Sequence, residues 1–513
     1  MLLDRSKLEV MKPSFHHCPA KHAMGEIQGT LFQPNFNRSI RVESRSERLS
    51  GDAGTLLLRE LAEVLGYRSI LREVLTDDRD PDRIRHPFGE LLLTELLLRA
   101  QGFTDHSDAA LLRHDPLLRL AVSERRGEAP IREAGDRRVP DGLASQPTLS
   151  RFLATLAEED NRDALGRALL ELTKRRLGLR EGRWHAEAIV DMDSLPIEVY
   201  GHQPGTAYNG HYRLRCYHPL VARLANGDFL GGKLREGQAH TADGGLAFVL
   251  PILEELARHY LEVWLRVDAG FPEPDLLRAL EARGFRYVAR LRGNRKLHRL
   301  AEPYLKRPPG RPPREGRTWV HDLSYQAGSW DTSRRVVLVV LERPGDQGEL
   351  FLDHFFLLTN APPKEMDGFQ LLERYRGRGD AERDFGELNT AFQVGLPSSP
   401  RPKSHYRGRD IATPCLPFDA FGANEARWLL TLHAANLLHA ARSLVHCRGQ
   451  RLWSRQRFRD HVLKLPARVT LGKRRVTVCL SVDRAGPWRT LARAIQALPS
   501  ARGSPSRSTL SPA

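Results

Sequence analysis

Cysteine is scarce in this sequence, and its spacing argues against two kinds of structural site. The 513 residues include five cysteines, which lie far apart and form no CxxC pair. Neither a zinc ribbon nor a disulfide framework is therefore expected. One local cluster, His16, His17 and Cys18 with His22, has side chains that bind metals, but it lies in a proline-containing segment with little periodicity.

Long apolar runs are also missing from the sequence. No stretch approaches the roughly 18 apolar residues that span a bilayer. The first residues lack an uninterrupted apolar signal core, so we expect a cytoplasmic protein without a membrane partner. No repeat of about 20–50 residues is evident, which argues against a solenoid.

The sequence does carry an excess of positive charge. Its 79 Lys and Arg residues exceed its 63 Asp and Glu residues, which gives a net charge of +16. A basic balance predicts a polyanionic partner, with nucleic acid first, although ribosome-associated and membrane-surface proteins and GC-rich coding also give arginine-rich chains. With 41% hydrophobic residues the chain is expected to fold, in more than one structural unit.

The amino-terminal part is expected to be a disordered tail (1–40) followed by a helical region (41–180) for DNA binding or dimerisation. Apolar residues recur there at helical spacing, and Asp52 is placed to cap the first helix. Residues 143–153 resemble a turn that opens a helix. That helix either contacts DNA or packs its leucines on the core with Arg151 in solvent.

The pattern changes at Trp184 to that of a mixed α/β core. The predicted order is β-β-β-α-β-α-β, with the second and third strands joined across Asn226-Gly227, a strong hairpin signal. These elements are strands 186–192, 219–224 and 228–234, helix 244–260, strand 263–267, helix 273–283 and strand 286–289.

A β-rich insertion is predicted to interrupt this core. The core's first part is placed at 181–300 and the insertion at 301–362, after a Pro/Arg-rich linker. The core's helices (368–392 and 420–445) fall within 363–446, followed by a carboxy-terminal region (447–497) with two strands and a disordered tail (498–513). The fold class expected is therefore α/β with a β-rich insertion, preceded by an all-helical region.

Two acids, Asp193 and Asp268, follow predicted strands. Ligands of α/β sheets usually bind at strand ends, but an aspartate there is also a common turn former or helix cap. Asp191 competes with Asp193, since residues two apart face the same side of a strand.

A third acid is predicted on a polar helical face. Tyr375, Arg378, Glu382 and Asn389 are spaced three, four and seven apart, which puts them within roughly 60° of one another on a helix. Glu387 is an alternative acid, but only Glu382 shares the face of Arg378. Three carboxylates on two strand ends and a helix are what two Mg²⁺ (or Mn²⁺) ions need for phosphoryl transfer.

The chain resembles the transposases of bacterial insertion sequences, in particular the family typified by insertion sequence 1380. The resemblance rests on residues 190–195, 198–201, 208–220 and 266–271, and on Tyr375 to Glu382, which matches a Tyr-x2-Arg-x3-Glu-x6-Lys signature. It covers residues from about 38 to 495. Where the signature has lysine, this chain has Asn389, which removes one phosphate-contacting cation.

The resemblance implies a ribonuclease H-like core whose metal ligands and catalytic acids are Asp193, Asp268 and Glu382. It favours Asp193 over Asp191, because Ser194 completes the family's Asp-Ser/Thr step. We expect DNA contacts from Tyr375, Arg378 and Asn389, and from the basic cluster that holds Arg292 and Lys296, which is alternatively a solvated loop.

The function implied is a DDE transposase that binds the terminal inverted repeats of its element as double-stranded DNA, cleaves there with two ions and joins the ends to target DNA. Synapsis of two ends implies a homodimer on DNA, and the protein would be nucleoid-associated. Two alternatives remain: a ribonuclease H-like nuclease without strand transfer, and an inactive DNA-binding descendant of a transposase.

Overall fold

The computed structural model describes residues 28–125, 127–131, 140–199, 203–307, 309, 315–342, 352–394, 404–406, 409–411, 420–446, 452–472 and 475–499. The chain forms two compact units, Met1–Leu49 and Ser50–Ala513. In the first unit β1 (Gln28–Phe32) pairs antiparallel with β2 (Val42–Ser44), so part of the segment predicted as a disordered tail forms a strand. β3 (Arg48–Ser50) crosses the boundary in the sequence between the two units, and the histidine and cysteine cluster at 16–22 lies outside the described residues.

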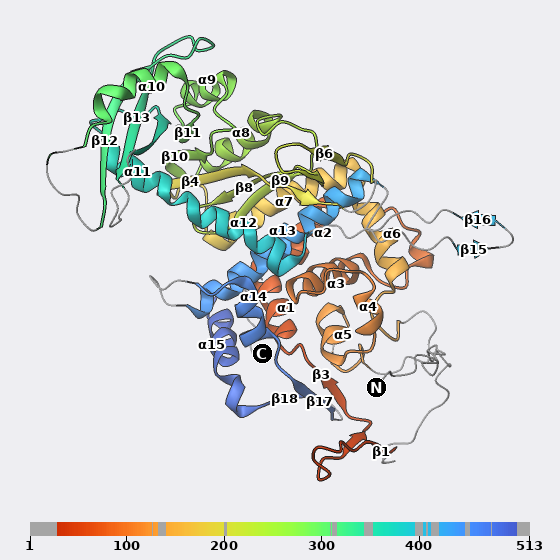
Figure 1. Ribbon diagram of the computed structural model, residues 1–513. Helices are drawn as coiled ribbons and strands as arrows, with labels where there is room; N and C mark the ends of the chain where they lie inside the picture. The colour runs from red at the N-terminus through yellow and green to blue at the C-terminus, as the bar shows by residue number, and fades with distance from the viewer. Residues whose placement is uncertain are drawn as a thin grey trace, which may run out of the picture. The chain divides into compact units, whose positions relative to one another are not determined.

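An eight-stranded mixed sheet organises the second unit (Figure 1). Its strand order is β12-β13-β14-β11-β10-β4-β8-β9. β10 is parallel to β4 and β11, and the other neighbours are antiparallel. The strands are β4 (His185–Ser194), β8 (Leu220–Leu224), β9 (Phe229–Lys233), β10 (Tyr260–Val267), β11 (Arg286–Leu291), β12 (Arg317–Tyr325), β13 (Arg334–Glu342) and β14 (Asp353–Thr359).

Both faces of the sheet are covered because its central strands are apolar on both sides. On one face Val190, Leu265 and Ala289 pack under α8 (Gly245–Leu256), α9 (Pro274–Ala282) and α10 (Arg295–Ala301). On the other, Trp264 and Val288 pack under α11 (Gly368–Arg376). The predicted order β-β-β-α-β-α-β is confirmed.

The strands predicted for the insertion extend this sheet rather than forming one of their own. β14 pairs with β11 from Val288↔Thr359 to Leu291↔Phe356, and β13 and β12 continue outward. Val336 to Val340 are completely buried, so β13 has an apolar residue on each face like a central strand. Pairing with β14 also removes the open edge that β11 would otherwise present.

Helices form most of the segment from Gly54 to Leu177, within the region expected to be helical, whereas β2 and β3 lie at the start of that region. The central element is α13 (Phe421–Val445), which is buried over most of its length and contacts α1, α3, α6 and α7. The amino-terminal helices are α1 (Gly54–Leu65), α2 (Tyr67–Val74), α3 (Phe88–Ala100), α4 (Asp108–Leu111), α5 (Pro116–Val122), α6 (Gln146–Leu156) and α7 (Glu159–Leu177), with a 3₁₀ turn, η2 (Pro81–Arg83).

A side chain of α13 closes the sheet at its β9 edge. The Asn436 amide accepts a 2.8 Å hydrogen bond from the Phe229 backbone N–H and donates one of 2.8 Å to the Phe229 carbonyl. The Thr173 hydroxyl of α7 donates to the same carbonyl. Helices therefore satisfy the backbone where another strand would pair.

Two local predictions for the helical region can be compared with the structure. The carboxylate of Asp52 does not cap α1; it forms an ion pair with Lys464 at 2.8 Å. The leucines of α6 pack in the core and Arg151 is exposed, which agrees with the packing interpretation of residues 143–153.

The remaining elements are short or lie near the carboxy terminus. The sequence did not predict the three-stranded sheet of β5 (Ile197–Glu198), β7 (Leu214–Tyr217) and β6 (Ala207–Asn209). The others are η3 (Glu302–Tyr304), α12 (Arg378–Phe392), β15 (Ser404–Tyr406), β16 (Arg409–Ile411), α14 (Arg455–Phe458), η4 (Arg459–Leu463), β17 (Ala467–Leu471), β18 (Val476–Leu480), η5 (Val482–Arg484) and α15 (Ala485–Gln496). Within the described ranges, no helix has both the length and the apolar character needed to cross a membrane.

The central strand β10 offers a test of the core. Leu265 is fully buried, whereas Leu261 on the same strand is 74% exposed. Leu265→Ala should lower the free energy of unfolding by about 2–5 kcal/mol, because it removes buried methyl groups and leaves a cavity. Leu261→Ala should change it by less than about 0.5 kcal/mol. Urea denaturation measures both, and equal losses would contradict this packing.

Candidate functional site

Two neighbouring parallel strands bring Asp193 and Asp268 to one edge of the sheet. Asp191 pairs with Arg266 in the β4–β10 register, so Asp193 and the residue after β10, Asp268, stand side by side. Each carboxylate also forms a local turn contact: Asp193 Oδ1 accepts from the Ser194 N–H at 2.9 Å, and Asp268 Oδ1 accepts from the Gly270 N–H at 2.9 Å. Asp268 therefore also has the turn-forming role that the sequence left open for an aspartate at a strand end.

The third predicted acid lies on a helix that begins later than expected. The predicted helix 368–392 is interrupted at Gly377, where α11 ends and α12 begins. A Cβ at position 377 would collide with the Arg266 guanidinium, so close packing against β10 requires glycine there. Tyr375 consequently lies on α11, while Arg378, Glu382 and Asn389 lie on α12.

Arg378 joins the acids of the sheet to the acid of α12. Its guanidinium donates to Asp193 Oδ2 from Nη2 at 2.8 Å and from Nη1 at 3.2 Å. The same Nη1 lies 3.8 Å from Glu382 Oε1. Arg378 is buried, whereas the Glu382 side chain is 68% exposed. The arginine therefore occupies the middle of the acid group, and Glu382 faces solvent at its rim.

The electrostatic environment of Asp193 is unusual for an aspartate. Burial, the largest cause, raises its pKa to about 6. The Arg378 guanidinium opposes this rise, and the negative charges of Asp268 and Glu382 add to it. A raised pKa with identified charge partners at a strand end is a physical reason to regard the group as functional.

Two tyrosines border the acids. The half-buried Tyr375 has a raised pKa, mainly through burial; Arg378 and Arg290 lower it, while Asp268 and Glu382 raise it. Tyr212, in the turn between β6 and β7, also has a raised pKa, through burial first and then the charge of Asp193. Tyr212 was not predicted as a site residue. It lies in a short turn after Asn209, and no motif or spacing in the sequence indicates that this turn lies near the acids.

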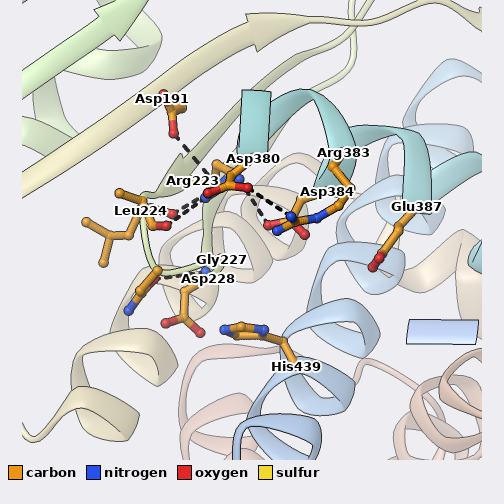
Figure 2. A network of polar contacts seen from close by, with 12 residues as sticks. Asp191, Arg223, Leu224, Gly227, Asp228, Asp380, Arg383, Asp384, Glu387 and His439 are labelled. Carbon is orange, nitrogen blue, oxygen red and sulfur yellow. Dashed lines mark hydrogen bonds and ion pairs between the residues drawn. The ribbon is translucent and has the colours of Figure 1, made fainter. Parts of the chain in front are cut away.

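Asp191 does not belong to the acid group. It is 1% exposed, and both of its oxygens are bound by the Arg266 guanidinium, with Nη2 to Oδ2 at 2.9 Å. Figure 2 shows it beside Arg223 in a polar network that also includes Asp384. The interpretation of Asp191 as an alternative first acid is therefore corrected, since its charge is already neutralised inside the protein.

The other predicted DNA contacts lie outside the acid group. Asn389 is exposed on α12, and Arg292 is exposed after β11. Lys296, on α10, donates to the Gln326 carbonyl at 2.9 Å and stacks over Tyr325. Within the same basic cluster the Arg290 guanidinium lies 5.2 Å from the Phe355 ring centroid, and its charge lowers the pKa of Tyr375.

The acid group has the donor chemistry of a magnesium site without being a closed one. Carboxylate oxygens are the ligands that Mg²⁺ and Mn²⁺ prefer, and a cation between these acids would offset the burial and repulsion that raise the pKa of Asp193. Over the described part of the chain, no three His, Cys, Asp or Glu side chains converge closely enough to hold an ion as they stand. Arg378 would have to release Asp193, and the exposed Glu382 would have to turn inward.

A family profile matches most of the chain. The transposase DDE domain group 1 profile matches residues 32–402, which include all three acids. This chain belongs to that transposase family. No curated protein matches the sequence.

One solved structure resembles the transposase weakly. It is described as a cryo-EM structure of a piggyBac transposase synaptic complex with hairpin DNA. The identity is 12% and the TM-score is 0.38, over 89% of this chain and 88% of that chain.

The raised pKa of Asp193 sets the sign of a pH effect on stability. Between its ordinary value of 3.8 and about 6, the unfolded chain has lost this proton while the folded chain keeps it, so stability from this group falls as pH rises. Asp193→Asn removes the penalty. The metal-free variant should match wild type near pH 4 and exceed it by about 2 kcal/mol above pH 6.

Denaturation curves in a chelator at several pH values measure this difference. Asp275→Asn is the matched control, because its carboxylate is 75% exposed. Its stability should stay within about 0.5 kcal/mol of wild type throughout. A constant difference between Asp193→Asn and wild type across this range would contradict the burial of a strained charge.

Proposed function

We propose that this transposase cleaves DNA at the ends of a mobile element and joins them to a target, with Asp193, Asp268 and Glu382 as its catalytic acids. The observation that carries the proposal is the grouping of these acids around Arg378 in a chain of the DDE transposase family. The antiparallel β4, β8 and β9 followed by the parallel β10 and β11 support a ribonuclease H-like core.

The three carboxylates would hold two Mg²⁺ or Mn²⁺ ions. When bound, such ions lower the pKa of an attacking water or 3′-hydroxyl and stabilise the leaving oxygen. Asp193 suits this role at neutral pH, since its pKa of about 6 leaves it ionised above that pH. Arg378, once released from Asp193, presents a buried guanidinium to a phosphate oxygen, where charge-assisted bonds are strong.

The remaining contacts would orient the DNA strand. Tyr375 stands between Arg378 and Arg290 and can stack on a base or donate to a phosphate. The net charge of +16 supports double-stranded DNA as partner, and pairing of two element ends implies a homodimer on DNA. We place the protein with the nucleoid and near the insertion sequence 1380 branch.

Two other functions use the same fold. A ribonuclease H-like nuclease would cut without joining, and an inactive descendant would bind DNA without chemistry. Asn389, in place of the signature lysine, is the observation that favours the inactive descendant. The presence of all three acids favours catalysis.

Labelled DNA carrying the element's inverted repeats tests the proposal in Mg²⁺ or Mn²⁺. Asp193→Ala, Asp268→Ala and Glu382→Ala should each lower cleavage and joining by on the order of 1,000-fold or more, as loss of a group that acts in a catalytic unit does. Glu373→Ala is the control, because Glu373 is an exposed acid on α11 paired with Arg376. Cleavage without joining would identify a nuclease, and wild-type binding without chemistry an inactive descendant.

The basic cluster after β11 gives a second, separate test. Arg292→Ala and Lys296→Ala should each weaken DNA binding and reduce the slope of log affinity against log salt by about one, as loss of one phosphate contact does. Arg258→Ala is the control, because Arg258 is a 72% exposed arginine beside Glu255 that precedes β10, whereas the basic cluster follows the parallel strand β11. Fluorescence anisotropy over a salt series measures the slope; an unchanged slope would mean that the cluster is a solvated loop.

A further inference from the structure

Beneath the acid group lies a buried layer of charges that no catalytic role accounts for. Its acids are Asp191, Asp384 and Glu387, and its arginines are Arg223, Arg266, Arg442 and Arg455. None of these side chains is more than 8% exposed. Taking this many charges out of water costs free energy that their pairing barely offsets, so stability alone does not explain the layer.

For each proposed catalytic acid, one residue of the layer lies two positions away in the sequence. Asp191 precedes Asp193 by two on β4, Arg266 precedes Asp268 by two on β10, and Asp384 follows Glu382 by two on α12. Residues two apart on a strand share a face, so Asp191 fixes the side of β4 from which Asp193 projects.

Arg223, from β8, connects these elements. Its Nη1 lies 3.0 Å from Asp384 Oδ2 and its Nε 3.9 Å from Asp191 Oδ2 (Figure 2). Nε and Nη2 also donate to the carbonyls of Leu224 and Ala225 at 2.9 Å each. A guanidinium held by its own strand in this way is a rigid bridge between β4 and α12.

Arg266 makes the corresponding connection from β10. It binds both oxygens of Asp191 and donates to the Arg374 carbonyl at the end of α11. Arg374 itself pairs with Glu187 of β4 at 2.8 Å and lies 4.2 Å over the Trp264 ring. The break at Gly377 lets the helices approach Arg266 this closely.

On its far side the layer secures α12 to the helical part of the unit. Arg455 Nη1 lies 3.1 Å from Asp384 Oδ1 and 2.7 Å from Glu387 Oε2, and Arg442 of α13 binds the same two acids. Arg455 also donates to the Gly227 carbonyl in the β8–β9 turn at 3.3 Å. Asp384 and Glu387, which both follow Glu382 on α12, therefore tie this helix to β8 through Arg223 and to α13 and α14 through Arg442 and Arg455.

We propose that Arg223, Arg266, Asp191 and Asp384 are positioning residues that fix the spacing of Asp193, Asp268 and Glu382. The inference rests on the proposed function, since these residues would hold the catalytic acids of that function in place. The spacing of the acids affects the rate, because displacement of a catalytic group by about 1 Å costs on the order of 100-fold in rate.

Arg223→Lys tests the bridge. Lysine keeps the charge, but it lacks the fork that contacts Asp384 and the two carbonyls together. The variant should lower the turnover of DNA cleavage about 10–100-fold with unchanged affinity for DNA. It should also weaken Mn²⁺ binding about 10-fold, measured without DNA from the EPR signal of the free ion.

Arg334→Lys is the matched control. Arg334 is a buried arginine of β13 in the same sheet, and it binds the Glu281 carboxylate from Nε at 2.7 Å and Nη2 at 2.8 Å. Loss of stability should be similar in the two variants, whereas turnover and Mn²⁺ affinity should change only in Arg223→Lys. If Arg223→Lys fails to fold, Asp384→Asn breaks the same bridge with an isosteric side chain, and the same outcomes are expected.

The outcomes separate this inference from the proposed function. Wild type that cleaves DNA, with Arg223→Lys equal to Arg334→Lys in turnover and in Mn²⁺ affinity, would overturn the positioning role alone. Wild type that leaves DNA intact, with Mn²⁺ binding weakened by Arg223→Lys and not by Arg334→Lys, would support the positioning role and remove the proposed function.

Discussion

The burial of a carboxylate among other acids is the constraint on which the site depends. Burial raises the pKa of Asp193 most, and the negative charges of Asp268 and Glu382 raise it further. A protein that needs only stability would separate such groups or pair each of them. Here a single guanidinium, Arg378, is shared between Asp193 and Glu382, which leaves the group short of positive charge. The divalent cations of the proposed function would supply the missing positive charge.

The surrounding architecture follows from holding these charges in place. Parallel pairing of β4 with β10 aligns two strand ends, and α12 can cross them only because α11 stops at Gly377. The underlying arginines compensate Asp191, Asp384 and Glu387 where water cannot reach. Charge is thus arranged in two levels: a buried level in which every carboxylate has an arginine partner, and an upper level in which three acids share Arg378.

Much of this could be predicted from the sequence. Alternating and helical periodicities gave the order from β4 to β11, and the Asn226-Gly227 turn gave the β8–β9 hairpin. Asp193 and Asp268 were identified because strand ends are visible as the last residue of an apolar run. Glu382 and Arg378 were identified because helical spacing keeps them on one face.

What the sequence could not give depends on contacts between distant segments. The pairing of β14 with β11 is a choice of neighbour, and periodicity specifies strands without naming their partners. Strand alternation puts Asp191 and Asp193 on the same face, and the pairing of Asp191 with Arg266, 75 residues later, is a contact that alternation does not predict. The break at Gly377 has the same origin, because the crowding comes from Arg266 and not from the local sequence.

The amide of Asn436 has a mechanical consequence. The side chain forms hydrogen bonds with both the N–H and the carbonyl of Phe229, as the backbone of a neighbouring strand would, although Asn436 belongs to a helix. The β8–β9 hairpin cannot slide along α13 without breaking both bonds at once, and no foreign strand can pair with Phe229 while they last. A displacement of α13 would therefore be transmitted to the β8–β9 hairpin through these two hydrogen bonds, and the helix and the hairpin would move together.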